Sequence, residues 1–308
     1  MSLIRSIRRF SIYGDRLTRV MESAVRVIPA WMEPIFVFFW AFVFYLVCRS
    51  QRRAIVSNLR SVFPKWSFCQ AQAGAFRVIW NFAWTLVDGV RASAGQDVIR
   101  WEIDGIEEFE QLAASSGGGI ILTAHMGNYD LAAPVFSERF GRRLNAVRAP
   151  ERDDELQEFK EKARDKHQSS SFAVRYNRVG EMLGVELVAL LQSGELVALQ
   201  GDRLLFEVSA MEGMMFGRRV SLPKGPFALA LAGKCPLWPL FIIREGWRHY
   251  RIKVGSKFEV SSDRHNRKEV MSAAIGTWCR ELEGVISNSW YQWFVFEPIF
   301  KIVPDRNS

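Results

Sequence analysis

The chain has 308 residues, of which 49% are hydrophobic and 24% charged, so it is neither disordered nor too small for a sizeable core. Lys and Arg outnumber Asp and Glu by 41 to 33, which gives a formal net charge of +8. This balance favours anionic partners such as lipid headgroups, nucleic acid or an acidic carrier protein. The four cysteines are scattered without a C-x-x-C pair. We therefore expect no metal site and no disulfide framework, but reduced thiols facing the cytoplasm.

The first distinctive segment is an unbroken apolar run of 14 residues from Ile35 to Cys48, rich in Phe and Trp. It is shorter than the ~20 residues that a membrane-spanning helix needs. Arginines flank it on both sides, whereas the positive-inside rule gives a spanning helix one basic flank. We expect a segment embedded from one face of the membrane, with both ends on the cytoplasmic side. A buried aromatic core helix is the alternative.

The chain divides by pattern into two parts. Residues 1–95 are expected to form an N-terminal helical membrane-anchoring region, with helices at 53–63 and 68–94 after the apolar run. In residues 96–308, strand and helix patterns alternate, which predicts an α/β fold with a mostly parallel mixed sheet flanked by helices. The expected strands lie at 119–123, 144–148, 171–175, 196–200, 238–243 and 250–254. The expected helices lie at 128–140, 153–167, 180–192, 225–233 and 267–286.

The most informative motif is the run from His125 to Asp130, which lies between a predicted strand and a predicted helix. Open α/β sheets bind their ligands at the carboxyl ends of the strands. We expect His125 to act as a general base there. Asp130, one helical turn away, would hold one tautomer of the ring and stabilise its charged form. The alternative is a surface His beside a helix N-cap, Asn128.

Polar residues also follow two other predicted strands. Arg148 ends the strand 144–148, and Gly201-Asp202-Arg203 follows the strand 196–200. If these strands run parallel to the first, all of these side chains emerge at the same edge of the sheet as His125. A local ion pair between Asp202 and Arg203 that closes a turn is the alternative for that pair.

A third cluster is the basic, Gly- and Pro-rich segment 216–226. It carries Arg218, Arg219 and Lys224 and is expected to be a loop that enters the helix 225–233. Cationic side chains near a helix N-terminus favour an anion, because free backbone N–H groups and the helix dipole add to their charge. The segment lacks the G-x-x-x-x-G-K-[ST] pattern of a P-loop.

The sequence lacks the motifs of several other classes of enzyme and of nucleic-acid-binding proteins. The sequence contains no G-x-S-x-G, H-E-x-x-H or G-x-G-x-x-G motif, which weakens serine hydrolase, zinc protease and dinucleotide-binding interpretations. The positive charge is modest and spread along the chain, without the pattern of a recognition helix or an RNA-binding sheet. We therefore expect no nucleic-acid partner.

Taken in chain order, these blocks resemble the lysophospholipid acyltransferase superfamily, and within it the bacterial late lipid A (secondary) acyltransferases. The aromatic stretch Trp290-Tyr291-Gln292-Trp293-Phe294 is similar to that branch as well. In the branch, the fourth and fifth residues after the His are commonly Trp and Glu. Here they are Tyr129 and Asp130, which keeps the acid of the wider superfamily but loosens the assignment to true lipid A enzymes.

The resemblance implies an O-acyltransferase at the cytoplasmic face of the bacterial inner membrane, without a resident cofactor or a covalent acyl-enzyme. The donor would be an acyl thioester on the phosphopantetheine arm of acyl carrier protein, or on coenzyme A. The acceptor would be a hydroxyl of a lipid or glycolipid, as in lipid A biosynthesis. The catalytic pair would be His125 and Asp130. The residues expected to bind substrate are Asn128, Arg148, Asp202, Arg203, Arg218, Arg219 and Lys224.

A second hypothesis is a non-catalytic, lipid-binding protein of the membrane surface with a degenerate acyltransferase site. The basic charge and the aromatic segment suit it equally well. What separates the two hypotheses is the pairing of His125 with Asp130, for which a simple binding protein has no need.

Overall fold

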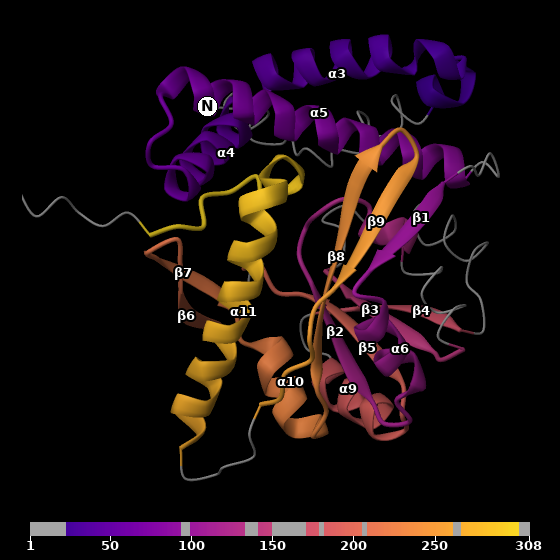
Figure 1. The fold of residues 1–308 in the computed structure, drawn as a ribbon, viewed down its shortest axis with the longest axis vertical. Helices are drawn as coiled ribbons and strands as arrows, with labels where there is room; N and C mark the ends of the chain where they lie inside the picture. The colour runs from indigo at the N-terminus through magenta and orange to yellow at the C-terminus, as the bar shows by residue number, and fades with distance from the viewer. Residues whose placement is uncertain are drawn as a thin grey trace, which may run out of the picture.

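The structure is a computed structural model that describes residues 23–93, 99–132, 141–149, 171–178, 182–204, 208–260 and 266–301. Within these residues, seven strands form one sheet in the order β1-β9-β8-β2-β5-β3-β4 (Figure 1). The parallel strands are β2 (Gly119–Thr123), β3 (Leu144–Arg148), β4 (Phe172–Tyr176), β5 (Leu196–Gln200) and β8 (Leu237–Gly246). Strand β9 (His249–Val254) is antiparallel to β8, and β1 (Arg100–Asp104) pairs with β9 in parallel. The predicted α/β fold with a mostly parallel mixed sheet is confirmed.

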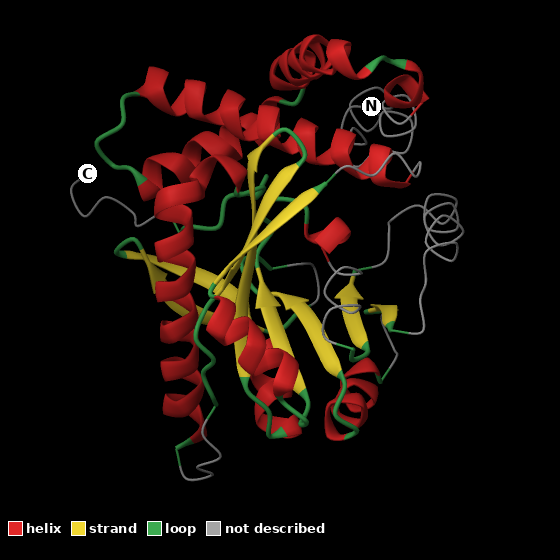
Figure 2. Cartoon of the chain, turned by 45° about the vertical axis from the view of Figure 1, so that its right-hand side comes forward, coloured by secondary structure: helices red, strands yellow, loops and turns green. Residues whose placement is uncertain are grey.

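Two hydrophobic cores cover the two faces of the sheet, because side chains alternate along each strand. Ile120 and Leu122 of β2 pack in the core formed with α9 (Leu183–Gln192), α10 (Gly225–Gly233) and α11 (Arg267–Ser289). Ile121 faces the other core, which contains residues of α6 (Ile106–Ala114). Figure 2 shows helices on both sides of the sheet.

Every predicted strand is present within a few residues of its expected position, but three strands were not predicted. Strand β1 lies at the edge of the sheet, where its five residues alternate between exposed and half-buried and give no apolar run. Strands β6 (Ala210–Met215) and β7 (Arg218–Pro223) form a separate antiparallel hairpin. The hairpin is rich in Gly, Met and Arg, so its alternation is weak in the sequence.

The helical predictions are largely confirmed. Those at 180–192, 225–233 and 267–286 correspond to α9, α10 and α11. The helix expected at 128–140 is helical from 129 to 132, and its remainder lies outside the described residues. The helix expected at 153–167 also lies outside them.

The N-terminal part contains α3 (Glu33–Val47), α4 (Arg49–Val62) and α5 (Phe68–Ser93), which lie together across one end of the sheet (Figure 1). Val37, Ala41 and Phe44 of α3 are buried at helical spacing, and both α3 and α4 pack on α5. Within the described residues, the segment Ala30–Val47 is long and apolar enough to cross a membrane by length and composition. Residues 94–98 are not among the described residues, so the domain division at residue 95 stays a prediction.

Candidate active site

His125 lies just beyond the carboxyl end of β2, where 5% of its surface is exposed. Strand β2 pairs in parallel with β5, and β5 pairs in parallel with β3. The polar residues that follow these strands therefore share one edge of the sheet, as the sequence predicts. His125 is a buried residue and not the surface His of the alternative interpretation.

A buried carboxylate of Asp202 holds the His125 ring. His125 Nδ1 lies 2.7 Å from Asp202 Oδ1, and the backbone N–H of His125 donates to Oδ2 at 3.0 Å. The indole N–H of Trp293 also donates to Oδ2, at 3.0 Å. Burial raises the pKa of Asp202, but the charge of His125 and the hydrogen bonds from it outweigh burial and hold that pKa below its ordinary value. Asp202 therefore stays ionised, which fixes the proton of the neutral ring on Nδ1.

The other ring nitrogen, Nε2, is then the basic atom of His125. Arg203 points at it: its Nε donates to His125 Nε2 at 3.1 Å. The same guanidinium donates from Nη1 to Glu297 Oε1 at 3.1 Å. The basic nitrogen of His125 thus lies in contact with the Arg203 guanidinium, and Glu297 fixes the orientation of that guanidinium.

The position of Asp130 corrects the expected catalytic pair. Asp130 is ion-paired with Arg148, which leaves the end of β3, and its own side chain is about half exposed. Asp130 was expected to hold one tautomer of the His125 ring, but the carboxylate found at the ring, on Nδ1, is that of Asp202. The charge of Asp130 outweighs burial and raises the pKa of the Arg148 guanidinium. Arg148 thus lies at the predicted edge of the sheet, in a second charge cluster.

Asn128 holds the turn that follows His125 in place. Its Nδ2 donates to the backbone oxygen of Thr85 on α5 at 2.8 Å, and its Oδ1 accepts from the N–H of Leu131 at 3.3 Å. The side chain therefore starts the helix that follows the motif and ties this turn to α5. These contacts give Asn128 a positioning role within the fold, and its contact with substrate stays a prediction.

The basic segment 216–226 was expected to be a loop, but most of it forms strand β7. Arg218 and Arg219 lie in β7, where buried Val220 and Leu222 alternate with more exposed neighbours. Lys224 precedes α10 and is exposed. Among the described residues, the partners of the His125 ring and of the Asp202 carboxylate include none of these three cations. They form a basic surface on the hairpin and the adjoining helix start.

Glu297 and Trp293 contact the residues of the site, although neither was expected to be a site residue. The backbone N–H of Phe294 donates to the carbonyl oxygen of His125 at 2.7 Å, which lays the aromatic stretch along the motif. Glu297 also lines a cavity of about 490 Å³, together with Arg53 and two serines of α4, Ser50 and Ser57. We call this cavity the Glu297 cavity; Glu297, one of its lining residues, accepts a hydrogen bond from Arg203, which in turn donates to His125 Nε2. The resemblance drawn from residues 290–294 was the only signal for this part of the site.

Comparison with known proteins identifies one family. The family model of bacterial lipid A biosynthesis acyltransferases matches residues 5–302, nearly the whole chain. This match confirms the resemblance drawn from the motifs around His125 and Asp202. A comparison with curated proteins gave no match.

Proposed function

The chain belongs to the bacterial lipid A biosynthesis acyltransferase family, and we propose that it transfers a fatty acyl chain from an acyl carrier protein thioester to a hydroxyl of a lipid or glycolipid. The observation that carries this proposal is the array of Asp202, His125 and Arg203. Its three groups are a buried carboxylate, an imidazole whose basic nitrogen is Nε2, and a guanidinium directed at that nitrogen. A non-catalytic lipid-binding protein would gain nothing from burying this array.

The first step is removal of a proton from the acceptor. The acceptor hydroxyl takes the position beside Nε2 that Arg203 Nε holds in this structure, and it donates its proton to Nε2 as its oxygen attacks the thioester carbonyl carbon. The imidazolium that forms is stabilised by Asp202, which keeps its negative charge throughout the step. The buried position of both residues strengthens this interaction, because little water screens it.

The attack places negative charge on the carbonyl oxygen of the thioester. The guanidinium of Arg203 lies next to the base and is held by Glu297, so it can donate to this oxyanion without being reoriented far. When the tetrahedral intermediate collapses, the carbon–sulfur bond breaks and the sulfur takes the proton from Nε2. The products are an acyl ester and a free thiol, and no acyl-enzyme forms.

The two substrates reach His125 from different parts of the protein. The Glu297 cavity is lined by α4, which directly follows α3, so it suits the headgroup of a lipid acceptor. The basic hairpin surface of Arg218, Arg219 and Lys224 suits an acidic carrier protein that brings the phosphopantetheine arm. Arg148 remains a candidate for an acceptor phosphate, although Asp130 already pairs with it.

Membrane association at the cytoplasmic face of the inner membrane completes the proposal. The face of α3 opposite to α5 exposes Phe39, Phe42 and Leu46 by 61%, 44% and 49%. An exposed apolar stripe along one helix is typical of a segment that lies in the membrane interface.

The test combines lipid mass spectrometry with a dead variant. Lipids from cells with the wild-type protein, without it, and with His125→Ala should be compared. We expect one acylated lipid to require the wild-type protein and to be missing with His125→Ala, while its hydroxyl precursor accumulates. Identical lipid profiles in all three strains would overturn the proposal.

A further inference from the structure

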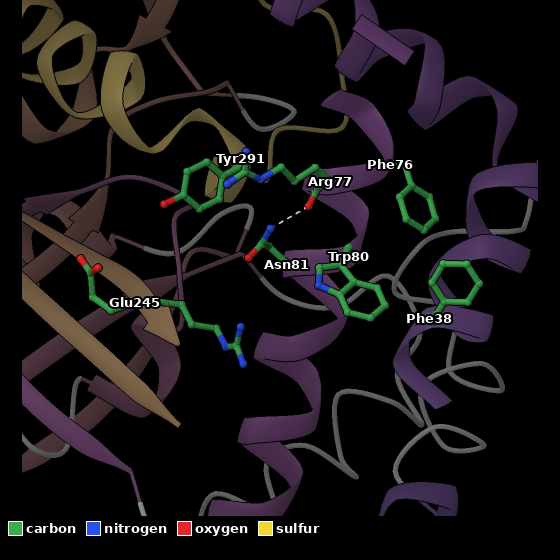
Figure 3. Close-up of a pocket in the computed structure, with 8 residues that line it drawn as sticks. Phe38, Phe76, Arg77, Trp80, Asn81, Glu245 and Tyr291 are labelled. Atoms are coloured by element: carbon green, nitrogen blue, oxygen red, sulfur yellow. Dashed lines mark hydrogen bonds between the residues drawn. The ribbon is translucent and has the colours of Figure 1, made fainter. Parts of the chain in front are cut away.

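Figure 3 shows a second cavity, of about 470 Å³, whose lining includes none of His125, Asp202 and Arg203. Its walls come from α3, α5, the end of β8 and the aromatic stretch at 290–292. One side is apolar, with the rings of Phe38, Phe76 and Trp80 in contact at centroid distances near 6 Å. The other side is polar and carries Arg77 and Arg244. An amphiphile with an anionic head matches this division.

Arg77 supplies a charge that is free to bind an anion. Its guanidinium lies 4.2 Å from the ring centroid of Tyr291 and 5.3 Å from that of Trp290. No carboxylate of the described residues forms an ion pair with Arg77. The aromatic contacts hold the planar group in one orientation without neutralising it, and a fixed guanidinium is suited to phosphate oxygens.

The remaining charges around the cavity are paired. Arg244 donates from Nε to the buried Asp88 at 3.2 Å and lies over the ring of Trp84. Glu245 also lines the cavity, but it pairs with Arg251 of β9 at 3.3 Å. In Figure 3 the guanidinium of Arg77 points to Tyr291, while the carboxylate of Glu245 points away from it. Among the described residues that line the cavity, Arg77 is thus the cation without a carboxylate partner, and Arg244 is a second cation nearby.

The apolar wall of the cavity continues onto the outer face of α3. Phe38 is 45% exposed, and its ring stacks with that of Phe42 at 6.3 Å along the same helix. Trp247, in the turn between β8 and β9, is exposed as well, and its neighbour Arg248 is ion-paired with Glu33 at the start of α3. Exposed Trp beside an apolar helix face marks the level of a membrane interface. On the membrane association proposed above, on which this inference rests, the cavity opens where lipid chains and lipid headgroups meet.

We propose that this cavity binds the phosphate headgroup of an anionic membrane phospholipid, with Arg77 holding the phosphate and the acyl chains lying along Phe38 and Phe42. The bound lipid is neither the donor nor the acceptor of the transfer reaction. It is a third lipid that holds α3 and α5 at the membrane surface. Recognition by charge predicts that the cavity prefers an anionic phospholipid to a zwitterionic one.

The test uses Trp80 as the reporter within the full-length protein in mixed micelles. Brominated phosphatidylglycerol and brominated phosphatidylcholine quench nearby indoles, and subtracting the signal of Trp80→Phe isolates the contribution of Trp80. We expect half-quenching of Trp80 at a several-fold lower mole fraction of phosphatidylglycerol than of phosphatidylcholine. Arg77→Gln should remove this preference and Arg77→Lys should keep part of it. Arg60→Gln, an exposed residue of α4, should leave it unchanged.

Three results of the quenching experiment would overturn the proposal. Equal quenching by both lipids in the wild-type protein, or an unchanged preference in Arg77→Gln, would remove the phosphate site. If millimolar inorganic phosphate abolished the preference, the ligand would be free phosphate and not a lipid. Acyl transfer in the same micelles separates this proposal from the proposed function. Arg77→Gln should keep the wild-type kcat, and a large loss of kcat would assign the cavity to a substrate.

Discussion

Asp202 and His125 are 77 positions apart, yet they form the central pair of the site at 2.7 Å. The register of the sheet explains their meeting. Thr123 of β2 is paired with Gln200 of β5, so the residues two positions beyond each strand end also come side by side. Parallel neighbouring strands thus deliver a base and a carboxylate to one point. Asp130 is nearer to His125 in the sequence than Asp202 is, but it lies on the helix that follows the motif.

The pairing predicts unequal effects for the two carboxylates. Asp202→Asn should lower kcat by about 10²–10⁴-fold, because an Asn does not stabilise the imidazolium and can favour the wrong tautomer of His125. Asp130→Asn should lower activity less, since Asp130 contacts Arg148 and its side chain is about half exposed. Steady-state kinetics on both variants, with His125→Ala as the inactive reference, would measure the difference. Full activity in Asp202→Asn together with a dead Asp130→Asn would restore the pair expected from the sequence.

Residues that are neighbours in the chain reveal a buried strand, but they do not reveal which side chains meet at the strand ends. Buried strands such as β2 are recognisable in the sequence as apolar runs. The expectation that the polar residues at the strand ends share one edge of the sheet was right for His125, Arg148 and Asp202. The partner of each side chain depends on strand order and register, which no local pattern encodes. The hairpin β6–β7 was missed for a related reason. Its alternation of buried and exposed residues is hidden among glycines, methionines and arginines.

Stability should depend on pH through Asp202. Its folded-state pKa is lower than the ordinary value of 3.8, so its contribution to stability is present above that value and is lost as the pH falls through the folded-state pKa. The difference in Tm between the wild-type protein and Asp202→Asn should therefore be largest near neutral pH and shrink in acid. Burial raises the pKa of Asp88, which gives the opposite slope, but both proteins carry Asp88 and its effect cancels. A Tm difference that stays constant from pH 7 to pH 3 would contradict this prediction.

The turn after His125 should tolerate no side chain at Gly127. This residue has a φ of 53°, and a Cβ placed there would lie 2.2 Å from the backbone oxygen of Ile242. Gly127→Ala should cost on the order of 1–3 kcal/mol and also reduce activity, because the backbone of the motif must shift. Gly184→Ala is the matched control, since nothing lies within 4 Å of a Cβ added at that position in α9. Thermal unfolding of both variants would measure the effect, and equal Tm values would show that the turn adapts without strain.

Substitutions on the basic hairpin surface should weaken binding of the acyl carrier protein donor only. Arg219→Ala and Lys224→Ala should raise KM for an acyl carrier protein thioester with little change in kcat, which is the signature of lost ground-state binding. The effect should weaken as salt rises, because exposed charges are screened within about 8–10 Å at physiological ionic strength. Arg100→Ala, on the exposed edge strand β1, serves as the control. If KM for an acyl coenzyme A donor rose as much as for the carrier protein, the hairpin would not be a protein-docking surface.

The packing of α3 predicts that the helix lies along the membrane surface. Glu33, at its start, is 1% exposed and ion-paired with Arg91 of α5 and with Arg248. The rest of its inner face packs on α5 along its length, so α3 runs beside the protein and does not lead away from it. Both ends of the helix should therefore lie on the cytoplasmic side.

Cysteine labelling can test this arrangement with a residue that the chain already carries. Cys69, near the start of α5, is exposed, whereas the other three cysteines are buried. A membrane-impermeant maleimide should label Cys69 in inverted inner-membrane vesicles and not in right-side-out vesicles. Arg26→Cys, combined with Cys69→Ser, places the probe before α3 and should give the same result. Labelling of position 26 and Cys69 from opposite sides would show that the segment spans the bilayer, and the embedded arrangement of α3 would then be wrong.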